Sequence, residues 1–360
     1  MDSLLIYGSY GYTGRLIARE AVSRGGSPVV AGRNHEHVLE QADELGVESR
    51  TFDLGEPKST IERRIEAFDA VLNCAGPFGE TCGPLVEACL ETGTDYLDIT
   101  GEFQVFDRLV DDDQRAREAG VTVLPGVGFD VVPTDCLSAF LHARLPSATD
   151  LTLGLAGTGS LSRGTARTMV RNLGTGGIVR RNGRLYRVPA AYDTREIDFG
   201  RGPTTATTVP WGDVVTAHHS TGIENIAVYA AVPSIAVRAM RAMNALKPIV
   251  GSRPVTSTLE RLVTAGIDGP DEDERESDEA VVWGEVTDAD GRTATARLRT
   301  PNPYTLTADT AVSAAQRVLE NEAPEGYQTP STAFGPDFVL DCEGVERELV
   351  SAPGLDLEAE

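Results

Sequence analysis

The chain has 360 residues and a formal net charge of −23, because 55 acidic residues outnumber 32 basic ones. This balance disfavours nucleic acid as a partner, since phosphate backbones bind basic surfaces. The composition is that of a globular protein, and the length predicts two domains.

Lysine is scarce, because all but two of the basic residues are arginine. Together with the low aromatic content of 6%, this indicates a halophilic protein of a high-salt cytoplasm. In molar salt, charges are screened within about 3 Å, which weakens the self-repulsion of an acidic chain. The alternative is an ordinary acidic protein.

The five cysteines form no C-x-x-C pair, so neither a disulfide framework nor a metal site is predicted. We expect no signal peptide, and the sequence has no uninterrupted apolar run of transmembrane length. We therefore expect a cytoplasmic protein.

The first predicted elements are a strand at residues 4–7 and a helix that follows Gly14 and ends at Gly25-Gly26, joined by a glycine-rich turn. Such a turn leaves backbone N–H groups at a helix N-terminus, where a pyrophosphate binds without any cationic side chain. A second strand at residues 28–31 completes one βαβ unit. The turn residues expected to bind the cofactor are Gly8, Ser9, Tyr10, Gly11, Tyr12, Thr13 and Gly14.

Arg33 follows the second strand, where NAD-binding units usually carry Asp or Glu for the ribose 2′-hydroxyl. An arginine there suits a 2′-phosphate. One charge-assisted contact of about 1.5–3 kcal/mol favours NADP over NAD by roughly one to two orders of magnitude. The alternative is a solvated surface arginine without a ligand. We predict NADP(H) as the cofactor.

Strands and helices continue to alternate as far as residue 124. Helices are predicted at 35–45, 57–67, 83–92 and 104–119, and strands at 48–54, 70–78, 96–99 and 121–124. This alternation predicts an α/β Rossmann domain with a doubly wound parallel sheet over residues 1–130. Asp53 near the end of the third strand is expected close to the adenine, and the fourth strand ends in a Gly-Pro turn that faces the ligand crevice.

The pattern changes from about residue 150. Short strands are predicted at 151–155, 186–188, 196–199 and 226–229, a helix at 234–246, a loop or disordered segment at 268–279 and a hairpin at 280–300. We expect a mixed α/β second domain, residues 131–304, with a largely antiparallel sheet. The segment 305–360, which opens with a helix at 307–321, is predicted to pack back on the Rossmann domain.

Five motifs occur along the chain in the order found in one family. They are GSYGYTGR at 8–15, AGR at 31–33, NCAGPF at 73–78, YLDITGE at 96–102 and GFDVVPTD at 128–135. The set resembles the saccharopine dehydrogenase-like oxidoreductases, in particular the branch of trans-acting enoyl reductases of lipid synthesis and uncharacterised saccharopine dehydrogenase-like proteins. PWGD at 210–213 is similar to the same branch, so the resemblance covers most of the chain.

The resemblance implies a Rossmann domain that binds NADP(H), a second domain that closes over the nicotinamide, and hydride transfer. The stretch expected beside the nicotinamide ribose comprises Asn73, Ala75, Gly76, Pro77 and Phe78. The residues expected to border the substrate crevice are Asp98, Thr100, Glu102 and Asp130. For Asp98 and Glu102 the alternative is capping of the following helix.

Reduction of a carbonyl or an activated C=C bond also needs a proton donor or an oxyanion stabiliser. The candidates for the acid are Tyr10 and two histidines predicted in a strand, His218 and His219. The alternative for the histidines is that one ring packs in the interior and the other faces solvent. The Tyr-x-x-x-Lys pair of short-chain dehydrogenases is absent, because Leu54 and Met243 stand four positions before the two lysines.

Residues 226–250 combine apolar side chains with Arg238, Arg241 and Lys247, which predicts an amphipathic helical surface. We expect this surface to pack in the core or to form a homodimer interface. The alternative is that it lines a tunnel for a long apolar substrate or contacts an anionic membrane peripherally. We expect an NADP(H)-dependent oxidoreductase that reduces an apolar, lipid- or isoprenoid-like enoyl or carbonyl substrate. An NADP-binding regulator without turnover and an opine- or saccharopine-type amino-acid dehydrogenase are the other hypotheses.

Overall fold

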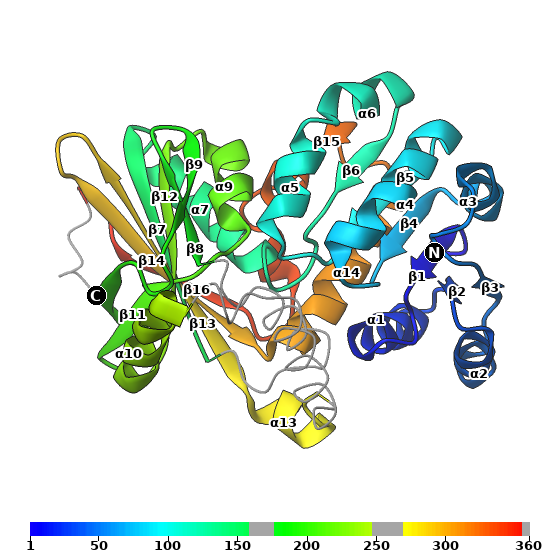
Figure 1. Cartoon of the computed structure of the whole chain (residues 1–360), viewed down its shortest axis with the longest axis horizontal. Coiled ribbons are helices and arrows are strands. Elements are labelled where there is room, and N and C mark those ends of the chain that lie inside the picture. Colours follow the sequence, from blue (N-terminus) through cyan, green and yellow to red (C-terminus); the bar gives the residue numbers. More distant parts are fainter. Residues whose placement is uncertain (158–175, 247–268, 355–360) are drawn as a thin grey trace. The chain divides into compact units, whose positions relative to one another are not determined.

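The computed structural model describes residues 1–157, 176–246 and 269–354, which divide into two compact units (Figure 1). Unit 1 comprises Met1–Val132 and Tyr304–Phe338, and unit 2 comprises Pro133–Pro303 and Val339–Glu360. The prediction that all of 305–360 packs on the Rossmann domain is therefore wrong beyond Phe338. The reason is that the last strand, β16 (Glu346–Ser351), pairs with β14 (Thr293–Pro301) of unit 2.

Unit 1 contains a parallel sheet of seven strands in the order β15-β6-β5-β4-β1-β2-β3. The strands are β1 (Leu4–Tyr7), β2 (Val29–Gly32), β3 (Ser49–Thr51), β4 (Ala70–Asn73), β5 (Asp95–Asp98), β6 (Thr122–Leu124) and β15 (Gly326–Tyr327). Every residue of β1, β2 and β4 is buried, as expected for a parallel sheet covered on both faces. The predicted doubly wound sheet is confirmed.

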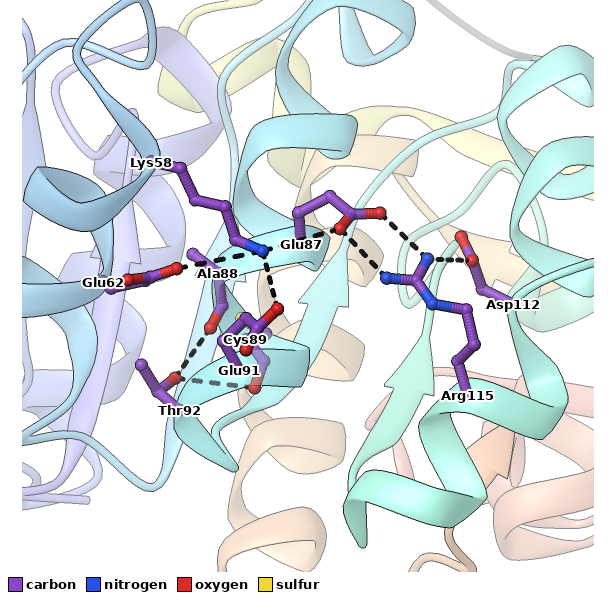
Figure 2. Close-up of polar contacts among 9 residues, drawn as sticks. All are labelled: Lys58, Glu62, Glu87, Ala88, Cys89, Glu91, Thr92, Asp112 and Arg115. Carbon is purple, nitrogen blue, oxygen red and sulfur yellow. Dashed lines mark hydrogen bonds and ion pairs between the residues drawn. The ribbon is translucent and has the colours of Figure 1, made fainter.

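Helices cover this sheet on its two sides. They are α1 (Tyr12–Ser23), α2 (His35–Leu45), α3 (Lys58–Ile65), α4 (Phe78–Thr92), α5 (Phe103–Val110), α6 (Asp113–Ala119), α14 (Pro303–Leu319) and α15 (Pro330–Phe334). On one side α1 pairs with α14, since Arg24 lies 2.9 Å from Asp309. On the other side Glu87 of α4 accepts two 2.9 Å hydrogen bonds from Arg115 of α6, and Lys58 of α3 lies 2.7 Å from Glu91 (Figure 2).

Two predicted helices of unit 1 differ most from the structure. The helix predicted at 83–92 begins at Phe78, because a carboxylate distant in the sequence, that of Glu102, accepts hydrogen bonds from its first N–H groups. The helix predicted at 104–119 is divided into α5 and α6 at three consecutive aspartates. Asp is a poor helix former and neighbouring carboxylates repel, which disfavours one continuous helix there.

Unit 2 contains a sheet in the order β10-β11-β12-β7-β13-β14-β16, with the hairpin β8–β9 attached to β12. Its further strands are β7 (Ala148–Ala156), β8 (Gly177–Arg181), β9 (Arg184–Val188), β10 (Thr194–Asp198), β11 (Pro203–Thr208), β12 (Asn225–Ala231) and β13 (Glu279–Asp288). Only the β12–β7 pair is parallel within the described residues, so the predicted antiparallel character is confirmed.

The remaining elements of unit 2 are α7 (Val132–Arg144), α9 (Asp213–Thr221), α10 (Ser234–Met243), α13 (Glu272–Ser277) and the 3-10 helices η1 (Asn244–Leu246) and η2 (Phe338–Asp341). The prediction of a loop at 268–279 is wrong for α13, which an Asp271–Glu274 capping box stabilises. The amphipathic stretch 226–250 is not one helix, because 225–231 form the mostly buried strand β12 and only 234–243 are α-helical. Its last residues, 247–250, lie outside the described part. Among residues 1–157, 176–246 and 269–354, no helix has the length and apolar composition needed to cross a membrane.

Candidate cofactor-binding site

The predicted cofactor residues of unit 1 gather at the carboxyl edge of its sheet. From β1 the chain continues to β2 and β3 on one side, and later to β4, β5 and β6 on the other. In open parallel sheets such a switch point is where a ligand binds, outside the carboxyl ends of the strands. The glycine turn after β1 lies at this point.

Gly8 and Gly14 shape the turn by allowing close backbone contacts. A Cβ on Gly8 would lie 2.7 Å from the backbone nitrogen of Ala75, which follows β4, and Gly8 has a φ of +79°. A Cβ on Gly14 would lie 2.5 Å from the Gly8 carbonyl oxygen. The turn after β1 and the loop after β4 therefore meet with no room for a side chain.

The turn presents unused backbone donors. The N–H groups of Gly8 and Ser9 donate to the Ala31 carbonyl, and the Gly11 N–H donates to the Gly8 carbonyl. Within the described residues the N–H groups of Tyr10, Thr13 and Gly14 have no acceptor, and no side chain caps α1. A cluster of free donors at a helix N-terminus is an anion site, which fits a pyrophosphate.

Arg33 is exposed directly after β2, and in the described part of the chain it forms no hydrogen bond or ion pair. Beside it, the Tyr10 ring lies over Gly32, where a Cβ would be 2.5 Å from the ring, and 5.4 Å from the His37 ring. These contacts place Tyr10 on the β2 side, the adenosine half of a Rossmann site. They favour its predicted role in cofactor binding over that of catalytic acid. Asp53 is exposed after β3 and accepts a 2.7 Å hydrogen bond from the Gly55 N–H.

The loop after β4 starts from a buried amide. Asn73 donates to the Tyr96 hydroxyl and to the Thr81 hydroxyl, each at 3.2 Å, and its Oδ1 accepts the Ala75 N–H. These bonds fix the path of the loop past the glycine turn. Gly76 at its tip is exposed, while Pro77 and Phe78 are half-buried. Burial also raises the pKa of the Cys74 thiol above its ordinary value.

The acidic residues after β5 organise loops. Asp98 is fully buried and accepts hydrogen bonds from Tyr96, Thr100 and Gly126, and burial raises its pKa to about 6. The Glu102 carboxylate accepts the N–H groups of Phe78 at 2.9 Å and Gly79 at 3.2 Å. The alternative that Glu102 caps the following helix is wrong, because its side chain caps α4, the preceding one.

Asp130 lies against the same loops. A Cβ on Gly101 would be 2.4 Å from the Asp130 carboxylate, so the loops after β5 and β6 are in close contact there. Burial raises the pKa of Asp130 to about 6. Thr100, also predicted at the crevice, is buried and accepts the Glu102 N–H at 3.0 Å. The crevice role of these residues remains a prediction.

One contact at the turn had no signal in the sequence. The Tyr12 ring packs edge-on against Tyr304 of α14, with ring centroids 5.1 Å apart. Tyr304 follows strand β14 of unit 2 in the chain, and only the return of α14 to unit 1 brings it to the turn. Phe129 is held in the same way, by a 3.0 Å hydrogen bond from its N–H to Thr307.

The two predicted catalytic histidines belong to unit 2. The prediction that they lie in a strand is wrong, because His218 and His219 form the last turn of α9, which ends at Gly222 in the left-handed conformation. His218 Nδ1 lies 2.8 Å from the Ile223 carbonyl oxygen, and His219 is exposed. Their catalytic role remains a prediction. Residues 1–157, 176–246 and 269–354 contain no cluster of His, Cys, Asp and Glu that could hold a metal ion.

Comparison with known families identifies this site. The family described as the saccharopine dehydrogenase NADP-binding domain matches residues 4–124, which run from β1 to the end of β6. Residues 4–124 are therefore similar to a saccharopine dehydrogenase NADP-binding domain. The match confirms both the resemblance to the saccharopine dehydrogenase-like family and the prediction of NADP(H) as the cofactor.

Relatives of this NADP-binding domain extend the comparison. A trans-acting enoyl reductase of Mycobacterium leprae is 33% identical over 150 residues, which are 39% of this chain and 36% of the relative. A saccharopine dehydrogenase-like oxidoreductase of Mus musculus is 35% identical over 152 residues, which are 37% of this chain and 35% of the relative. The chain thus matches little more than a third of the length of these curated relatives.

The apo saccharopine dehydrogenase (L-Glu forming) of Saccharomyces cerevisiae has a similar fold beyond the NADP-binding domain. The likeness covers 97% of this chain and 99% of that one, with a TM-score of 0.64 at 13% sequence identity. At 13% identity this similarity shows a shared fold only. It supports the assignment of one Rossmann unit and one mixed α/β unit to this chain.

Proposed function

We propose that this chain is an NADP(H)-dependent oxidoreductase that transfers hydride to an enoyl or carbonyl group. The observation that carries the proposal is the anion-binding turn with unpaired Arg33 beside it, at the switch point of an NADP-binding domain. Bound NADPH supplies the hydride. The residues of this chain bind the pyrophosphate at the turn and the 2′-phosphate at Arg33.

The arrangement of the sheet supports distinct places for the two halves of the cofactor. Arg33 and Asp53 follow β2 and β3, on the side proposed for the adenosine half. The loops after β4, β5 and β6 lie on the other side of β1, and we assign the nicotinamide half to them. Their hydrogen bonds leave the carboxylates of Asp98 and Glu102 committed to backbone N–H groups. We propose His218 or His219 as the proton donor.

The substrate class is proposed from the relatives. Because a mycobacterial relative is named a trans-acting enoyl reductase, we propose an apolar, lipid-like substrate with an activated C=C or C=O bond. A cytoplasmic location, adaptation to high salt and a homodimer are further proposals from the sequence.

The test is hydride transfer from labelled cofactor. The full chain is incubated in molar salt with NADPH deuterated at nicotinamide C4 and with a panel of long-chain enoyl thioesters and apolar ketones, and products are analysed by mass spectrometry. We expect deuterium in a product of at least one substrate class. Deuterium in none, with NADPH bound, would instead support the hypothesis of a regulator without turnover.

A further inference from the structure

The glycine turn is held from behind by a buried side chain of α2, that of Gln41. Gln41 is 4% exposed, and its Nε2 donates a 2.9 Å hydrogen bond to the Ser9 carbonyl oxygen. Its Oε1 is buried and has no partner within the described residues. A buried acceptor without a donor costs stability. The hydrogen bond to the Ser9 carbonyl is therefore the one favourable polar contact that the Gln41 amide makes within the described residues.

That contact fixes a peptide group of the anion site. The Ser9–Tyr10 peptide bond is trans, so its carbonyl and its N–H point in opposite directions. Because the carbonyl points to the buried Gln41 side chain, the Tyr10 N–H points away from Gln41. This N–H is one of the donors that have no acceptor in the described part of the chain.

We propose that Gln41 is a positioning residue for the cofactor, which orients the Ser9–Tyr10 peptide group and so aims the Tyr10 N–H at the pyrophosphate. The proposal rests on the proposed function and adds to it a residue that itself touches no cofactor. A donor oriented before binding interacts more strongly with an anion than one that must first reorganise. Without Gln41 the peptide group rotates more freely, and binding has to reorder it.

The test separates the pyrophosphate from the 2′-phosphate. Calorimetry on the full chain compares Gln41→Leu, and Gln41→Met as a second variant of similar length, with the parent. The ligands are NADPH, NADH, ADP-ribose, which has the pyrophosphate alone, and 2′-AMP, which has the 2′-phosphate alone. We expect both variants to weaken NADPH, NADH and ADP-ribose by a common factor of about ten and to leave 2′-AMP within about twofold.

Arg33→Ala is the matched control, with the opposite pattern: weaker NADPH and 2′-AMP, and unchanged ADP-ribose. The urea midpoint of the Gln41 variants is expected near that of the parent. Each variant removes one buried unpaired acceptor, the Oε1, and leaves another, the Ser9 carbonyl. Unchanged NADPH affinity in both folded variants, or an equal loss for all four ligands, would overturn the role of Gln41. A parent chain that binds neither NADPH nor ADP-ribose would overturn the proposed function itself.

Discussion

Gly8→Ala tests the close contact on which the cofactor turn depends. A methyl group there would lie 2.7 Å from both the Cβ and the backbone nitrogen of Ala75, well inside the ordinary contact distance of at least 3.4 Å. Overpacking of this kind costs about 1–3 kcal/mol. The φ of +79° adds about 1–2 kcal/mol for a residue with a side chain. We expect the free energy of unfolding to fall by about 2–5 kcal/mol.

Gly25→Ala is the matched control, because Gly25 has nearly the same φ, +81°, but a Cβ added there would have nothing within 4 Å. It should carry only the backbone cost, about 1–2 kcal/mol. The assay is urea unfolding followed by far-UV circular dichroism, with NADPH affinity measured in parallel. A loss for Gly8→Ala no larger than that for Gly25→Ala would refute the close contact between the turn and the loop after β4.

Glu87→Gln should lower the free energy of unfolding by about 0.5–1 kcal/mol in dilute salt and by less in 1 M salt, because the exposed ion pairs with Lys58 and Arg115 are screened (Figure 2). Glu40→Gln, at an exposed position, is its control in the same urea titrations. The whole chain should show the opposite dependence, with a lower urea midpoint in dilute salt than in 1 M salt, since its charge of −23 is then poorly screened; an unchanged midpoint would contradict this. Burial raises the pKa of Asp98 to about 6, so the folded chain binds a proton more readily than the unfolded chain between about pH 4 and 6. Stability should therefore rise as the pH falls from 7 to 5.5, and Asp98→Asn should remove about 1 kcal/mol of that rise in pH-dependent urea midpoints.

The parts of the fold that the sequence predicts are those encoded locally. The strand β1, the glycine turn and Arg33 lie within the first 33 residues, and the φ of +79° at Gly8 favours glycine there. The antiparallel hairpin of β13 and β14 is equally local, because Asp290-Gly291 marks its turn.

What the sequence does not predict depends on contacts between distant residues. The start of α4 is set by Glu102, which follows the next strand. Tyr304 and Gln41 reach the turn only through the packing of α14 and α2. The segment with His218 is rich in Val and Thr, which favour a strand, yet it forms α9 between Gly212 and Gly222. Tertiary packing overrides local propensity there.

The most direct test of the central claim is the ratio of the dissociation constants for NADH and NADPH, measured by calorimetry on the parent chain and on Arg33→Ala. We predict a ratio of roughly ten to a hundred in the parent, because one charge-assisted contact with the 2′-phosphate contributes about 1.5–3 kcal/mol. In Arg33→Ala the ratio should fall close to one, with NADH affinity unchanged. A ratio near one in the parent, or an equal weakening of both cofactors in the variant, would contradict the assignment of Arg33 to the 2′-phosphate.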